Sequence, residues 1–366
     1  MALRASRPRA FIVVMRPAFL LRVVVGVMLT LVPVAAAAPP TLPPGFTAEM
    51  YVTGDGYTAD AWRGLPGIPS TGTMAVDADG VLYLARSGRR YTGGESEDLG
   101  RVYRIPPGGA RLTPQSEPRY LIGPPLPNPQ VASVRGGREL LITTFDRDRT
   151  VGVLYRMLSG RAELLAGGTP PRGTPPLLKQ PEGAVADAGG NVYVADRAQG
   201  VVLRLNPQGE VLDPRVVSVG RPRLVALGPE QLWVAADGTA EAPWQRGPGE
   251  IWQVSPDGKA TLMLTGPVAA GMSVGPAGRL FVADRQGGEI FLLAPDGKKL
   301  EFARFAEGDA PRTLAFVPAT PETRRAGIAG DLLVVTVSRG AWPVNEVVRV
   351  SGPFERFVQD GAASPR

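Results

Sequence analysis

The side chains available for chemistry in this chain are carboxylates, hydroxyls, arginines and lysines, because the 366 residues include no cysteine and no histidine. The absence of cysteine excludes disulfides, thiolate metal sites and a cysteine nucleophile. The absence of histidine removes the commonest metal ligand and the commonest general base. Any acid–base or metal chemistry must therefore rely on carboxylates, hydroxyls, arginines and a few lysines.

Charged residues that could do such work recur where one apolar segment ends or another begins. They are Arg86, Glu182, Asp196, Arg223, Asp284 and Arg312. Gathered at a narrow opening, such side chains could hold a polar ligand or a Ca²⁺ ion through its preferred oxygen donors. Glu182 and Asp196 are the candidate catalytic bases if burial raises their pKa, and Glu182 and Asp284 are the candidate metal ligands. An aspartate after Val-Ala is also part of a repeated phrase, in which it would cap backbone N–H groups.

Three of the five tryptophans fall in long segments between apolar runs. They are Trp62, Trp244 and Trp342. Flat aromatic faces beside a polar opening suit stacking against a sugar or a heteroaromatic ring. We therefore group these tryptophans with Arg86, Arg223 and Arg312 as candidate ligand-binding residues, while the alternative is that the indoles only fix the long loops in place.

An internal repeat in the sequence predicts the strands that must position these residues. In its clearest copy, apolar runs at 183–187, 192–196 and 201–205 are separated by tight turns, and a near-duplicate runs from 272 to 297. The 46 glycines and 38 prolines argue against long helices. Repeats of this length, each supplying about four short strands, are typical of propeller blades.

The repeat predicts an all-β, six-bladed β-propeller with four-stranded blades, preceded by an N-terminal signal helix. The blades are expected near 73–110, 131–166, 182–218, 223–264, 271–304 and 312–358. Residues 46–52 are the predicted closing strand, placed beside 354–358, because closure removes exposed strand edges. The short turns and the long, tryptophan-bearing loops are expected on opposite faces of the ring.

Residues 1–37 form a predicted signal peptide, and 38–366 form the single propeller domain. The segment has five arginines and no acidic residue, followed by an apolar run and then small residues near Ala37. Subtracting these five charges from the formal net charge of +6 leaves about +1 for the mature chain. We therefore expect a periplasmic or secreted monomer that does not bind nucleic acid. It would touch a membrane only through an uncleaved signal segment.

Several short motifs resemble known propeller families. The residues at 186–187, 191–196 and 295–297 resemble NHL-type repeats, which gluconolactonase propellers share in looser form. The closing segment, from 314–318 through 330–334 to 347–350, is similar to the last blade of the soluble glucose and sorbosone dehydrogenases. That resemblance implies a pyrroloquinoline quinone cofactor, Ca²⁺ and a histidine base. The sequence departs from it, with Ser-Arg-Gly-Ala-Trp at 338–342 where the family shows His-Gly-Ser-Trp-Asn.

Three functions are therefore considered. The first is a propeller that binds a polar, sugar-like small molecule or an envelope protein on its loop-rich face, as a catalytically degenerate relative of the sugar dehydrogenases. The second is a quinone-dependent sugar dehydrogenase, and the third is a metal-dependent hydrolase of the gluconolactonase type. The missing histidine favours the first, and the fold alone does not decide among them.

Overall fold

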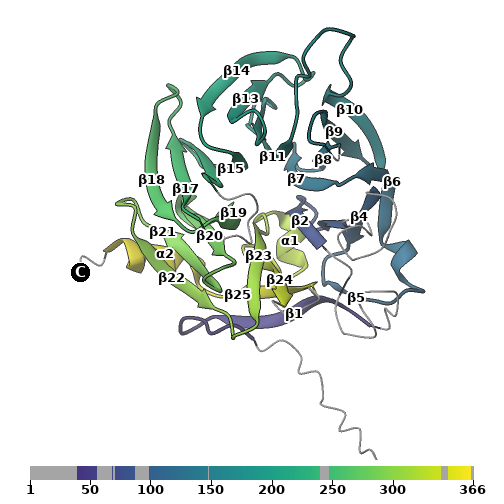
Figure 1. Ribbon diagram of the computed structural model, residues 1–366. Coiled ribbons are helices and arrows are strands. Elements are labelled where there is room, and N and C mark those ends of the chain that lie inside the picture. Colours follow the sequence, from purple (N-terminus) through teal and green to yellow (C-terminus); the bar gives the residue numbers. More distant parts are fainter. Residues whose placement is uncertain are drawn as a thin grey trace, which may run out of the picture. The chain divides into compact units, whose positions relative to one another are not determined.

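The chain forms a ring of β-sheets around a central axis, as seen in its computed structural model (Figure 1). The structure describes residues 39–55, 68, 71–86, 99–146, 148–239, 247–338 and 345–363. Within these residues there are six sheets, five of four strands and one of five. The predicted all-β, six-bladed propeller with four-stranded blades is confirmed, whereas the predicted signal helix lies outside the described residues.

The first three blades follow one another along the chain, each running from the axis outward. Blade 1 contains β2 (Thr71–Val76), β3 (Leu82–Arg86), β4 (Leu99–Ile105) and β6 (Leu121–Pro127). Blade 2 contains β7 (Gln130–Arg135), β8 (Glu139–Phe145), β9 (Gly152–Leu158) and β10 (Arg161–Gly167). Blade 3 contains β11 (Pro181–Ala186), β12 (Val192–Asp196), β13 (Val201–Leu205) and β14 (Val211–Ser218).

The last three blades complete the ring. Blade 4 contains β15 (Pro222–Leu227), β16 (Leu232–Ala236), β17 (Gly249–Val254) and β18 (Ala260–Gly266). Blade 5 contains β19 (Ala269–Val274), β20 (Leu280–Asp284), β21 (Glu289–Leu293) and β22 (Lys299–Arg304). Blade 6 contains β23 (Asp309–Phe316), β24 (Leu332–Ser338) and β25 (Asn345–Ser351), with β1 (Thr47–Gly54) and β5 (Ala110–Leu112) on its outside.

Burial follows from the position of a strand within its blade. Every residue of β16, β20 and β21 is buried, because neighbouring blades cover both faces of these middle strands. Outer strands such as β14 and β18 expose most of their residues. The continuous apolar runs in the sequence are therefore the strands that hold adjacent blades together.

Aspartate side chains shape the tight turns between the first two strands of a blade. Asp187 accepts hydrogen bonds from the backbone N–H and the side-chain amide of Asn191, both at 2.9 Å. Asp77 accepts from the N–H groups of Asp79 and Val81 in the same way, again at 2.9 Å. Asp and Asn favour such turns because their side chains replace backbone hydrogen bonds locally. These turns lie at the end of the ring opposite the starts of the inner strands.

The ring closes through the N-terminal strand, but its partner differs from the predicted one. β1 pairs antiparallel with β25, with Thr47 opposite Ser351 and Val52 opposite Val347. The residues after β25 form helix α2 (Phe354–Ala363), so the predicted strand at 354–358 is wrong. Phe354, Phe357 and Val358 recur at helical spacing.

Helix α2 packs its aromatic side chains against Phe46, the residue that precedes β1. The rings of Phe46 and Phe354 lie 4.9 Å apart at 76°, and those of Phe46 and Phe357 lie 5.9 Å apart at 86°. These edge-to-face contacts join the residue before β1 to the residues after β25. The C-terminal segment therefore closes the ring by aromatic packing as well as by strand pairing.

Two further segments differ from the predicted blade boundaries. In blade 1 the outermost strand is β6, whereas β5, near the predicted end of that blade, pairs in parallel with β1. The insertion in blade 6 contains helix α1 (Pro321–Arg325), whose N-cap Thr320 donates a hydrogen bond to the carbonyl of Ala78 at 2.7 Å. No helix in the described parts of the chain has the length and apolar character needed to cross a membrane.

Candidate ligand site at the axial mouth

The innermost strand of each blade is interrupted by a bulge near its start. In blade 3, for example, Pro181 lies opposite Asp196 and Gly183 lies opposite Ala195, which leaves Glu182 without a partner. The residues at the corresponding irregularities are Gly72 with Thr73, Ala132, Glu182, Arg223, Ala270 and Arg312. A bulge re-aims the side chain that it displaces. The fold therefore builds a ring of re-aimed residues at one end of the axis, which we call the axial mouth.

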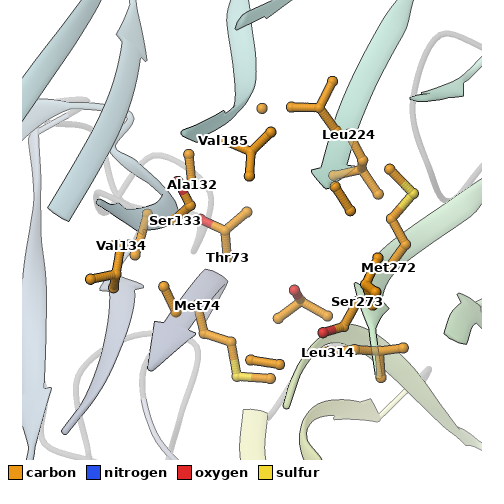
Figure 2. A pocket seen from close by; sticks show the side chains of 18 of the residues that line it. Thr73, Met74, Ala132, Ser133, Val134, Val185, Leu224, Met272, Ser273 and Leu314 are labelled. Atoms are coloured by element: carbon orange, nitrogen blue, oxygen red, sulfur yellow. The ribbon is translucent and has the colours of Figure 1, made fainter. Parts of the chain in front are cut away.

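Below the axial mouth the inner strands surround a cavity of about 260 Å³. Figure 2 shows its lining side chains, contributed by separate inner strands, around a central space. Most of the lining residues are apolar, and the hydroxyls of Thr73 and Ser133 are buried and have no hydrogen-bond partner among the described residues. Glu182 also lines this cavity, so it connects the mouth to the interior. A ligand entering the axis would meet this carboxyl.

A buried ion triad fixes one side of the mouth. Asp237 accepts from Arg197 Nε at 3.1 Å and from Arg223 Nε at 2.8 Å. Asp237 is 1% exposed, and both arginines are 6% exposed. Arg223 also donates to the carbonyl of Ala269 in the next blade. Because buried charges require such partners, the triad holds the two guanidinium groups in a single arrangement.

Glu182 lies beside this triad. Its Oε1 accepts a hydrogen bond from the side-chain amide of Gln180. Burial raises the pKa of Glu182, and the positive charges of Arg223 and Arg197 oppose that shift without cancelling it. Glu182 is therefore a mouth carboxyl with a raised pKa, and its oxygens can accept hydrogen bonds from a ligand.

Arg312 occupies the opposite part of the ring. Its Nη2 and the amide oxygen of Gln130 border Gly72, lying 4.0 and 3.4 Å from the point where a Cβ would stand. Burial lowers the pKa of Arg312 to about 10, and the charges of Arg285 and Arg223 contribute to this shift. The side chain makes no hydrogen bond or ion pair with any residue that the structure describes.

The other charged candidates have local partners. Asp196 is fully buried and accepts from the backbone N–H groups of Lys179, Gln180 and Gln199 and from the Gln199 side chain. Asp284 is 6% exposed and accepts from the N–H of Gly287 at 2.8 Å. Both aspartates therefore cap the turn that follows their strand, as expected if the aspartate of Val-Ala-Asp has a structural role. Asp196, which accepts four hydrogen bonds, is poorly placed to act as a catalytic base.

Arg86 is engaged at blade 1. Its Nε lies 3.1 Å from Glu117 Oε1, and Glu117 belongs to the segment that leads to the outermost strand. Glu117 also accepts from the hydroxyl of Tyr103, which is buried in the blade core. The structure thus ties Arg86 to the outer part of its blade, whereas it gathers Glu182, Arg223 and Arg312 at the axial mouth.

The donors needed for a protein-held metal ion do not converge. In the described portion of the chain, no group of three or more Asp, Glu, His or Cys side chains could hold a metal. Glu182 is held by Gln180 and Asp284 by its own turn, so this pair does not fit the predicted divalent site. We therefore derive no chemistry through a metal.

The three candidate tryptophans Trp62, Trp244 and Trp342 lie outside the described residues, so their predicted stacking role stays a prediction. The other two tryptophans belong to blade 4. Trp233 is 6% exposed in the core, and Trp252 donates to Glu250 Oε2 at 2.8 Å.

Sequence comparison and structure comparison give different results. No protein-family model matches the chain, and no curated protein matches it. Among solved structures, a gluconolactonase from Xanthomonas campestris is 16% identical with a TM-score of 0.53, covering 87% of this chain and 99% of that chain. The form of aldose sugar dehydrogenase from Streptomyces coelicolor that is bound to pyrroloquinoline quinone is 13% identical with a TM-score of 0.54, covering 85% and 99%.

At such identities the likeness establishes the fold and leaves the activity open. The chain shares its six-bladed architecture with both groups of propellers that its repeat motifs resemble, which confirms that resemblance.

Sequence reasoning missed three members of the mouth: Arg197, Asp237 and Arg285. Each directly follows the last residue of the second strand of its blade. A signal for the site was present nonetheless, because the three charged bulge residues each follow a proline at the start of an inner strand.

Proposed function

We propose that this protein binds a polar, sugar-like small molecule at its axial mouth and does not turn it over. The observation that carries the proposal is the ring of bulges, which displaces Glu182, Arg223 and Arg312 at one end of the inner strands, where Glu182 lines the axial cavity. Binding sites commonly combine an apolar wall with a few convergent polar groups. Pockets for drug-sized ligands are about 300–1,000 Å³, so a cavity of about 260 Å³ suits a ligand of monosaccharide size.

The polar groups support recognition of hydroxyl-rich molecules. Glu182 supplies an acceptor at the mouth, and Thr73 and Ser133 belong to the lining of the same cavity. Their hydroxyls have no hydrogen-bond partner among the described residues, and a buried polar group without a partner costs free energy. The proposal places the protein in the periplasm or outside the cell, with residues 1–37 removed on export. N-terminal sequencing of the protein purified from the native host tests that placement.

A screen of sugars, sugar acids and lactones by thermal shift tests the proposed binding. A molecule that binds only the folded chain raises its melting temperature by mass action. The Glu182→Gln variant should weaken the response to the best neutral sugar, whereas Glu210→Gln, on an exposed turn at the other end of blade 3, should leave it unchanged. If no compound at millimolar concentration shifts the wild-type protein, the binding proposal fails.

A quinone-dependent sugar dehydrogenase is the second candidate, and one observation favours it. Glu182 has a pKa raised by burial, as a general base working near neutral pH requires. Against it, the chain lacks histidine, the base that the family resemblance implies. Dye reduction by aldoses after addition of pyrroloquinoline quinone and Ca²⁺ would replace the binding proposal with this one.

A further inference from the structure

We propose that the ligand of the axial mouth carries an oxyanion, a carboxylate or a phosphate, and that Arg312 binds it. This inference rests on the proposed function, because it names the class of molecule that the same site accepts. It follows from the position of Arg312, from the contrast with the other mouth arginines and from the space beside its guanidinium group.

The position of Arg312 is set by the backbone. Pro311 pairs with Thr336 and Thr313 pairs with Val335, so Arg312 is the displaced residue of β23. The equivalent residue in blade 3 is Glu182, which lines the cavity, and the equivalent residue in blade 4 is Arg223. Arg312 therefore stands in the same ring as the residues that define the entrance.

The contrast with its neighbours concerns counter-charges. Arg197 and Arg223 share Asp237, and Glu182 lies close enough for both arginines to act on its pKa. Arg312 has no such carboxylate among the residues that the structure describes. The described charges that act on its pKa are those of Arg223 and Arg285, both positive. With a pKa of about 10 it stays protonated at neutral pH, so a partly buried cation faces two other cations.

An arginine in such surroundings is costly unless something negative pairs with it. No described protein group does so. The planar guanidinium group matches the two oxygens of a carboxylate or phosphate in a bidentate pair. An anionic ligand would therefore remove an electrostatic penalty that the described residues leave in place.

The residue beside the Arg312 guanidinium group is a glycine. A Cβ at position 72 would be in ordinary van der Waals contact with the amide oxygen of Gln130 at 3.4 Å and with Nη2 of Arg312 at 4.0 Å, so the missing side chain leaves room for one small group. A ligand oxygen bound to Arg312 could hence approach the backbone of β2. Gln130 would at the same time accept a hydrogen bond from a neighbouring ligand hydroxyl.

Isothermal titration with three matched probes tests the inference: glucose, gluconate and glucose 6-phosphate. They share a hydroxylated carbon chain and differ in the presence and kind of oxyanion. Because a hydrogen bond to a charged group outweighs a neutral one, we expect at least one anion to bind the wild type about tenfold or more tighter than glucose. Which anion gains shows whether a carboxylate or a phosphate is recognised.

The decisive variant is Arg312→Gln, with Arg161→Gln as its control. Arg161 lies on β10 with 84% of its side chain exposed, so its replacement makes the same change in net charge far from the entrance. We expect Arg312→Gln to remove the preference for the anion, to retain glucose binding and to melt no lower than the wild type. Arg161→Gln should behave as the wild type.

Two outcomes would overturn the inference, and they are distinguishable from failure of the proposed function. If glucose binds but neither anion binds more tightly, or if Arg312→Gln keeps the preference, the oxyanion inference is wrong while sugar binding stands. If none of the three probes nor any other sugar or sugar acid binds the wild type, the proposed function fails and the inference fails with it.

Discussion

Replacing Asp237 with asparagine tests whether the buried triad holds the axial mouth together. The substitution keeps the size of the side chain and removes its charge. Asp237 is 1% exposed and bridges Arg197 and Arg223, which are each 6% exposed. The variant thus leaves two guanidinium groups in the interior with only Glu182 nearby as a counter-charge.

The expected loss follows from the cost of an uncompensated buried charge. Removing one partner of a buried pair costs about 3–5 kcal/mol. We expect about 3 kcal/mol, because Glu182 offsets part of the loss and the asparagine oxygen can still accept one hydrogen bond. Glu163→Gln is a matched control, since Glu163 also bridges two arginines, Arg156 and Arg161, but is 40% exposed. An exposed pair contributes about 0–1 kcal/mol.

Urea denaturation of both variants measures the difference. Asp237→Asn should lower the midpoint strongly at an unchanged m-value, and Glu163→Gln should lower it slightly. A difference below about 1 kcal/mol between the two free energies of unfolding would show that the triad does not hold the mouth, and the electrostatic argument for the site would be refuted.

Two further predictions concern a turn and a titration. Gly209→Ala should lower the free energy of unfolding by about 3 kcal/mol or more, because its Cβ would stand 1.9 Å from the carbonyl oxygen of Leu165. The control Gly258→Ala has a similar positive φ (+82° against +88°) but open space around the new Cβ, so it should cost only about 1–2 kcal/mol. Equal losses on denaturation would refute the packing argument. Because burial raises the pKa of Glu182, the folded state holds that proton more tightly than the unfolded state. The stability of the wild type relative to Glu182→Gln should therefore fall as the pH rises from its ordinary pKa of 4.5 through the raised value, and a pH-independent difference would contradict the shift.

The sequence predicts the architecture because each blade needs the same pattern of buried apolar strands and tight turns, and that pattern recurs as the repeat. Strands such as β12 and β20 read as continuous apolar runs, since each is covered on both faces, and the aspartates of the tight turns mark where one strand ends. The same reasoning failed at 354–358, where a short apolar pattern fits either a strand or a helix. Aromatic packing against Phe46 accounts for the helix there.

The candidate site could also be predicted only in part from the sequence. The sequence by itself determined that Glu182, Arg223 and Arg312 begin inner strands, and that no histidine or cysteine can assist them. Only the tertiary structure decided that a bulge displaces each of them from its strand pairing, that Asp237 bridges Arg197 and Arg223, and that no described carboxylate pairs with Arg312. The physical reason is that charge pairing depends on distances between blades, and residues 40 apart in the chain, such as Arg197 and Asp237, meet only when neighbouring blades pack together.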